Sequence, residues 1–125
     1  MRGCPRRSVP EASFGLSVGG ELRGAVITSR DDRGPYIDSI QVDPRWQGRG
    51  MGRALLVRAL GALQDAGNRD DVGLVYLRQN VPAEALYRSV GFVPSTFSRN
   101  VGRGYWIRRR TLRAVLDRAA TAKYR

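Results

Sequence analysis

Three glycines within five positions separate a strand-like stretch from a helical stretch, and this junction most constrains the fold. Residues 36–42 alternate apolar and polar side chains as a half-buried strand does, and residues 54–63 carry apolar side chains at helical spacing. The glycines between them are Gly48, Gly50 and Gly52. Glycine leaves backbone N–H groups uncovered, and the start of a helix adds partial positive charge. The junction is therefore expected to bind phosphate.

The spacing of the glycines excludes two common nucleotide-binding loops. A triphosphate-binding loop needs a lysine followed by serine or threonine, whereas Arg53 and Ala54 follow the last glycine here. A dinucleotide-binding loop needs Gly-x-Gly-x-x-Gly and an acidic residue at the end of a second strand. This chain has Gly-x-Gly-x-Gly and no acidic residue at that place. A tight turn with packing glycines is the structural alternative.

Two blocks of residues together resemble the GNAT superfamily of N-acetyltransferases. The segment from Gln47 to Gly52 is similar to the family's Gln/Arg-x-x-Gly-x-Gly/Ala loop, which holds the diphosphate of acetyl-CoA. Residues 80–92 are similar to its second block, Asn-x-x-Ala-x-x-Leu-Tyr-x-x-x-Gly-Phe. The resemblance covers about residues 22–107 and is strongest over 36–92. It implies an α/β (α+β) fold, with a mixed, mostly antiparallel sheet flanked by helices and a central parallel strand pair splayed to admit CoA.

The resemblance also implies acetyl-CoA as a co-substrate and suggests which residues bind it. They are the end of the first motif strand, the loop, a polar residue after the second strand and a tyrosine on the next helix: Ile40, Gln41, Val42, Gln47, Gly48, Arg49, Gly50, Met51, Gly52, Arg53, Asn80 and Tyr87. Backbone groups of the strand end would pair with the pantetheine arm. Arg49 and Arg53 would contact the diphosphate or the 3′-phosphate. A solvated helix start is the alternative for these arginines, although positive charge there opposes the helix dipole.

Two side chains are candidates for the proton transfers of an acetyl transfer. In the family a tyrosine at the place of Tyr87 lies near the CoA sulfur, and a phenol with a pKa of about 10 can protonate a departing thiolate. A half-buried core tyrosine is the alternative. Asp38, expected on the same strand face as Ile40, is the candidate base for the attacking amine. Asp38 could equally face solvent or pair with an arginine, and a chain of water molecules could act instead.

The implied activity is transfer of the acetyl group from acetyl-CoA to a primary amine by direct attack in a ternary complex. The amine would belong to a small molecule or to a protein N-terminus. The alternative is a truncated, non-catalytic module that binds CoA, RNA or another protein. This alternative rests on length, because 35 residues precede Tyr36 where relatives usually have a strand and two helices that shape the acceptor pocket. The chain would then be a fragment or a minimal variant, or would complete its pocket as a homodimer.

The charge distribution bears on possible macromolecular partners. Of the net charge of +11, residues 93–125 supply +8, from nine basic residues and one acidic residue. Such a region can attract nucleic acid. However, 21 of the 22 basic residues are arginine, which indicates a coding bias, and few aromatic side chains lie among them to stack on bases. Nucleic acid is therefore not expected as a partner.

Other features of composition concern membranes, metals and the compartment. No aliphatic stretch is long enough to span a bilayer, and residues 1–10 lack the apolar segment of a secretory signal. One cysteine and no histidine make a disulfide framework or a structural metal site implausible. We expect a cytoplasmic protein with no metal and no membrane partner.

The remaining patterns predict the organisation along the chain. Residues 1–13 should be a disordered lead-in, residues 14–110 the acetyltransferase domain, and residues 111–125 a basic C-terminal helix or tail. Within this frame the sequence predicts strands over 14–18, 21–29, 36–42, 72–77, 92–93 and 104–109, and helices over 54–63, 82–90 and 111–122.

Overall fold

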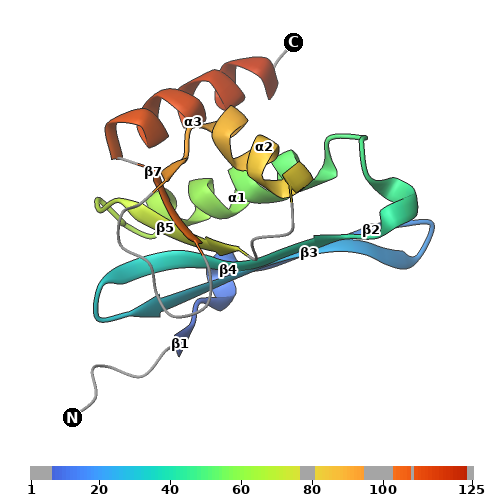
Figure 1. Cartoon of the computed structure of the whole chain (residues 1–125), viewed down its shortest axis with the longest axis horizontal. Helices are drawn as coiled ribbons and strands as arrows, with labels where there is room; N and C mark the ends of the chain where they lie inside the picture. Colours follow the sequence, from blue (N-terminus) through green and yellow to red (C-terminus); the bar gives the residue numbers. More distant parts are fainter. Residues whose placement is uncertain (1–6, 77–80, 95–102, 108, 124–125) are drawn as a thin grey trace.

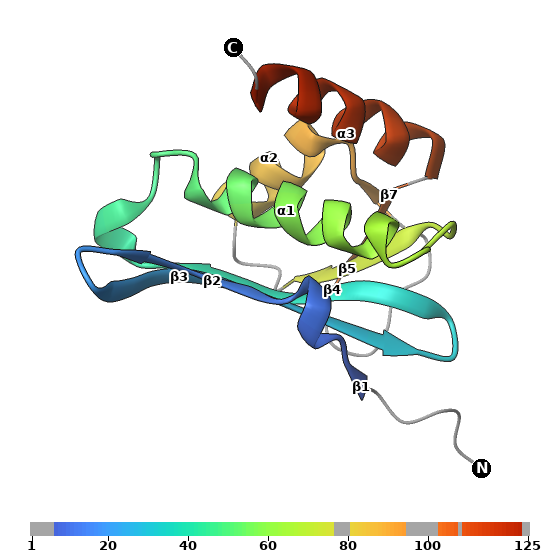
Figure 2. The ribbon, with the colours of Figure 1, turned by 180° about the vertical axis from the view of Figure 1, so that it is seen from behind.

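A computed structural model describes residues 7–76, 81–94, 103–107 and 109–123, and it contains a seven-stranded mixed sheet. The three α-helices lie on the same side of this sheet in both views (Figures 1 and 2). The elements are β1 (Arg7–Ser8), η1 (Pro10–Ala12), β2 (Phe14–Val18), β3 (Glu21–Asp31), β4 (Gly34–Val42), η2 (Pro44–Trp46), α1 (Met51–Asp65), β5 (Val72–Tyr76), α2 (Val81–Val90), β6 (Val93–Pro94), β7 (Arg103–Ile107) and α3 (Arg109–Lys123), where η denotes a single 3₁₀ turn.

The sheet has the order β1-β3-β4-β5-β7-β6, and β2 pairs with the same edge of β3 as β1 does. Among the described strands, β4 and β5 form the parallel pair, and they align at two positions only, Tyr36 with Gly73 and Ile37 with Leu74. Strand β4 continues to Val42 beyond this pairing. The predicted mixed, mostly antiparallel sheet with a splayed central pair is therefore confirmed.

The core lies between the sheet and α1, because α1 places one apolar stripe against the strands. Leu56, Leu60 and Leu63 are almost fully buried and recur at helical spacing. They pack in one cluster with Val26 of β3 and Ile37 of β4. Burying each such side chain contributes about 1.5–3 kcal/mol, so this interface holds α1 at a fixed height above the sheet.

The N-terminal segment contains regular structure where the sequence predicts a disordered lead-in. Val9 and Ala12 are buried in the core. The Val9 N–H donates to the carbonyl of Thr28 (2.8 Å), and the Thr28 hydroxyl donates to the carbonyl of Ala12 (2.6 Å). The Thr28 N–H in turn donates to Ser13 Oγ (3.0 Å). Residues 7–13 are thus attached to β3 by contacts with a residue distant in sequence, which local composition does not reveal.

The C-terminal segment forms the helix α3, which packs against α1. Leu112 and Val115 of α3 are buried, and a Cβ atom added at Gly61 of α1 would lie 3.7 Å from Leu116. Gly91 ends α2 with φ = +124°, a conformation that glycine commonly adopts after the last turn of a helix. Helix α3 therefore contributes side chains to the core of the domain.

Replacing Thr28 by valine should lower the free energy of unfolding by about 1–3 kcal/mol, because the buried Ala12 carbonyl would lose its donor while the side-chain shape is kept. Urea unfolding of the two proteins measures the difference. Ser17→Ala on β2 is the control, since this exposed serine should change stability by no more than about 0.5 kcal/mol. Equal stability of Thr28→Val and the wild type would contradict the proposed anchoring of residues 7–13.

Candidate functional site

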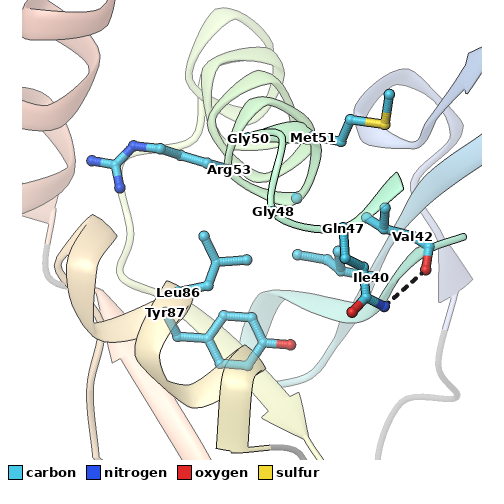
Figure 3. Close-up of a pocket in the computed structure, with 10 residues that line it drawn as sticks. Ile40, Val42, Gln47, Gly48, Gly50, Met51, Arg53, Leu86 and Tyr87 are labelled. Carbon is cyan, nitrogen blue, oxygen red and sulfur yellow. Dashed lines mark hydrogen bonds between the residues drawn. The ribbon is translucent and has the colours of Figure 1, made fainter. Parts of the chain in front are cut away.

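A pocket lies where the end of β4, the start of α1 and α2 meet (Figure 3). Its volume is about 270 Å³. The residues that line it come from β4, the loop before α1, α1 itself and α2: Ile40, Val42, Gln47, Gly48, Gly50, Met51, Gly52, Arg53, Leu86 and Tyr87. The two sequence blocks therefore come together in space. Of the predicted site residues, Asp38, Gln41 and Arg49 do not line the pocket, and Asn80 lies outside the described residues.

Alternate residues of β4 direct their backbone groups toward the pocket. The Asp43 N–H donates to the carbonyl of Arg23 on β3 (2.7 Å), and in an antiparallel pair every second residue bonds to the same neighbour. Gln41 therefore also turns its backbone toward β3, while Ile40 and Val42 turn theirs toward the gap beside β5. No described strand pairs with these two residues on that side, so their backbone groups form an open strand edge.

The Val42 carbonyl already has a partner within the loop. Gln47 Nε2 donates to the Val42 oxygen (3.1 Å), which fixes the loop to the strand end (Figure 3). The side chain of Gln47 thus replaces one of the strand contacts that β5 does not supply. A role of this kind explains why an amide side chain suits the first position of the loop.

The loop itself needs glycine for its backbone conformation rather than for space. Gly48 and Gly50 have φ values of +78° and +83°, in the left-handed region, and a Cβ atom at either would meet nothing within 4 Å. Gly50 is the N-cap of α1 and supplies no side-chain acceptor. The first N–H groups of α1 are therefore uncapped and point to the pocket mouth, where an anion would satisfy them.

The helices α1 and α2 approach closely beside this loop. A Cβ atom at Gly52 would lie 3.0 Å from Leu86 Cδ2, so a larger residue would require the Leu86 side chain to shift. Arg53 donates through Nη1 to Ser89 Oγ (2.9 Å), and this bond joins the same two helices. Figure 3 shows the guanidinium of Arg53 turned away from Gln47. The sequence did not suggest Leu86 or Ser89 as site residues, although both flank Tyr87 on the motif helix.

A charged cluster holds the segment that leads into the loop. The carboxylate of Asp43 accepts hydrogen bonds from the Arg45 N–H (3.0 Å) and from Arg23 Nη1 (3.0 Å). The backbone donor of Arg45 and the two guanidinium groups hold the pKa of Asp43 below its ordinary value of 3.8. The ionised carboxylate therefore stabilises the fold above this ordinary pKa. Its contribution is lost as the pH falls through the lower pKa of the folded state.

The two loop arginines have different surroundings. Arg49 places its guanidinium carbon 4.5 Å from the ring centroid of Trp46, outside the pocket lining. Arg53 contributes to the lining but donates to Ser89. Both arginines are exposed to solvent. Direct phosphate contacts from these side chains remain predictions.

Tyr87 is buried on α2 and its position is fixed by the end of that helix. The N–H groups of Gly91 and Phe92 both donate to the Tyr87 carbonyl (3.2 and 3.0 Å), and the Phe92 ring packs edge-on against the Tyr87 ring at 6.5 Å. The side chain of Tyr87 is 5% exposed. Figure 3 shows its hydroxyl directed toward Ile40 and Gln47. The phenol therefore lies at the inner end of the pocket.

Asp38 does not share the face of Ile40, so that expectation is wrong. The pairing of β3 with β4 shifts register at Asp38, which is the extra residue of a β-bulge. Ile37 and Ile40, three positions apart, both pack toward the helices. Asp38 instead lies on the opposite face, where its carboxylate accepts a hydrogen bond from Ser29 Oγ (2.9 Å). The structure does not bring Asp38 and Tyr87 into one pocket.

Among the described residues, no three His, Cys, Asp or Glu side chains gather as a metal site would require. No helix there has both the length and the apolar character needed to cross a bilayer.

Alanine substitutions at two glycines should have opposite effects on stability. Gly50→Ala should lower the free energy of unfolding by about 1–2 kcal/mol, because an L-residue is strained at this positive φ. Gly61→Ala should raise it by up to about 1 kcal/mol, because this glycine lies inside α1 with room for a methyl group. Urea unfolding measures both values. A stabilising Gly50→Ala substitution would refute the left-handed conformation of the loop.

Comparisons with known proteins agree with this geometry. The sequence model of the acetyltransferase (GNAT) domain matches residues 11–94. A mycothiol acetyltransferase of Thermobifida fusca (strain YX) is 44% identical over 70 residues, which cover 55% of this chain and 21% of that protein. N-alpha-acetyltransferase RimI of Mycobacterium tuberculosis (strain ATCC 25618 / H37Rv) is 42% identical over 85 residues, which cover 62% of this chain and 49% of that protein.

Solved structures share the fold. The PaiA N-acetyltransferase of Thermoplasma acidophilum, solved in complex with coenzyme A, superposes with a TM-score of 0.69 and 17% identity over 77% of this chain and 59% of that one. The chain thus spans less than two thirds of the length of each of these three proteins. The domain match covers more than half of the sequence, and the chain belongs to the GNAT acetyltransferase domain family.

Proposed function

We propose that this chain is an acetyl-CoA-dependent N-acetyltransferase that acetylates a primary amine. The observation that carries the proposal is a single pocket lined both by the uncapped glycine loop and by Tyr87. The loop suits the diphosphate of acetyl-CoA, and the tyrosine suits the reacting end of the same molecule. Membership of the GNAT family and the names of two similar proteins, a RimI N-alpha-acetyltransferase and a mycothiol acetyltransferase, support it.

In the proposed complex, the N–H groups at the start of α1 bind the diphosphate, because they have no side-chain cap. The pantetheine arm runs along the open edge of β4 in place of β5 and pairs with Ile40 and Val42. Leu86 and Tyr87 cover it from the side of α2. The coenzyme A bound in the Thermoplasma acidophilum relative supports a ligand of this class.

The proposed chemistry needs two proton transfers. The amine nitrogen attacks the thioester carbonyl carbon, whose oxygen gains negative charge near the Val42 N–H. The carbon–sulfur bond then breaks, and the Tyr87 hydroxyl donates a proton to the departing thiolate. The proton lost by the amine goes to Asp38 or to water. Asp38 lies on the face of the sheet opposite the pocket, so it accepts this proton only if the amine enters from that face.

The proposed acceptor is a primary amine. The similar protein RimI is named an N-alpha-acetyltransferase, and the similar protein of Thermobifida fusca is named a mycothiol acetyltransferase. The described part of the chain is basic around the loop, which favours the anionic cofactor there and leaves the amine to approach from elsewhere. A panel of peptides with free N-termini and of small amines covers the acceptors to be tested.

Tyr87→Phe should lower kcat about 100-fold in an assay that detects thiol release from acetyl-CoA, because the thiolate would lose its proton donor. The affinity for acetyl-CoA should change little. Tyr36→Phe is the matched control, since Tyr36 lies on β4 but does not line the pocket, and its turnover should equal that of the wild type. Unchanged turnover in Tyr87→Phe would remove this residue from the mechanism. Absence of thiol release from wild type with every amine in the panel would contradict the proposed activity.

A further inference from the structure

Trp46 lies beside the glycine loop with guanidinium groups near its ring. The guanidinium carbon of Arg49 is 4.5 Å from the ring centroid, and that of Arg23 is 5.3 Å away. Both distances are within the range of cation–π attraction. Trp46 therefore links a residue of β3 to a residue of the loop.

The two arginines differ in how their positive charge is balanced. Arg23 forms ion pairs with Asp43 (3.0 Å) and with Glu21, and its side chain is 16% exposed. Arg49 is exposed and, among the described residues, contacts the ring of Trp46 without any hydrogen bond or ion pair. A guanidinium that stacks by its face keeps the N–H groups on its edge free for a ligand. The Trp46 ring thus positions the Arg49 guanidinium, and the N–H groups of this guanidinium can donate to a ligand.

Neighbouring cations near the loop are already engaged. Arg53 donates to Ser89 Oγ, and Arg45 lies 3.5 Å from the Asp43 carboxylate. Arg58, farther along α1, stacks on Phe14. Arg49 is therefore the loop cation best suited to an additional anion.

The position of Arg49 relative to the pocket indicates which anion this side chain would bind. Gly48 and Gly50 on either side of it line the pocket, whereas its own side chain does not. If the diphosphate of acetyl-CoA binds the loop and pantetheine runs inward to Tyr87, the other end of the molecule must leave over the outer rim. That end carries the 3′-phosphate, a monoester with a charge of about −1.5 to −2 at neutral pH.

We propose that Trp46 is a positioning residue that holds Arg49 against the 3′-phosphate of acetyl-CoA, so that the site distinguishes this molecule from its 3′-dephospho form. This inference rests on the proposed function. Arg49 supplies charge-assisted hydrogen bonds to the phosphate. Trp46 fixes the guanidinium beforehand, which reduces the loss of side-chain freedom on binding.

The test compares the dissociation constants of CoA and 3′-dephospho-CoA, measured by calorimetry. Wild type should prefer CoA by about 10-fold or more, the value of a charge-assisted hydrogen bond. Arg49→Gln should reduce the preference to about 1. Trp46→Leu should reduce it strongly while leaving the affinity for 3′-dephospho-CoA almost unchanged. The double variant should be no worse than Arg49→Gln, because both substitutions remove one interaction.

Arg45→Gln is the matched control, since it removes the same charge four positions earlier and should keep the preference for CoA. Circular dichroism and urea unfolding check that each variant folds. If Trp46→Leu does not fold, the preference of Arg49→Gln for CoA over 3′-dephospho-CoA is the deciding measurement. Equal weakening of both ligands by Trp46→Leu would overturn the proposal, because it would indicate a general structural role. Equal binding of both ligands to wild type would also overturn it, with the proposed function intact. Binding of neither ligand would overturn the proposed function and this inference together.

Discussion

The separation of β4 from β5 is the constraint on which the rest of the site depends. The strands align at Tyr36 and Ile37 and then diverge, although β4 continues to Val42. Among the described residues, the divergence leaves backbone groups of Ile40 and Val42 without a strand partner, and edge groups of this kind need a hydrogen-bond partner. The chain meets part of this need itself, through Gln47 and the Val42 carbonyl. A ligand with amide groups along an extended arm would meet the rest, which is why the proposed acetyl-CoA site begins at this gap.

The packing of α1 on the sheet places the other two parts of the site, the glycine loop and α2. The apolar stripe of α1 fixes its height, and the left-handed Gly50 turns its uncapped N-terminus toward the gap. On the other side, Gly52 lets Leu86 approach to within van der Waals contact, so that the same helix start also places Tyr87. The proposed phosphate binding and the proposed proton donation are therefore connected through one short helical turn. A substitution that widens this contact should affect both.

The parts of the fold that the sequence predicts are those in which local chemistry and tertiary structure agree. The predicted strand over 36–42 and helix over 54–63 form on either side of the glycine loop, as β4 and α1. The parts that it does not predict depend on partners distant in the chain. Ala12 is ordered by Thr28, sixteen positions later, and a bulge in the β3–β4 pair moves Asp38 to the opposite face. Arg49 turns to Trp46 rather than into the pocket, which a charge pattern alone cannot reveal.

Calorimetric titration of the wild type, Gly50→Glu and Gly50→Ala with acetyl-CoA shows whether this pocket binds the cofactor. We expect micromolar binding to the wild type and none to Gly50→Glu, because the introduced carboxylate would repel the diphosphate at the helix start. Gly50→Ala carries similar backbone strain without the charge and should retain measurable affinity. Absence of binding to the folded wild type, or equal binding to Gly50→Glu, would contradict the assignment of this pocket to acetyl-CoA.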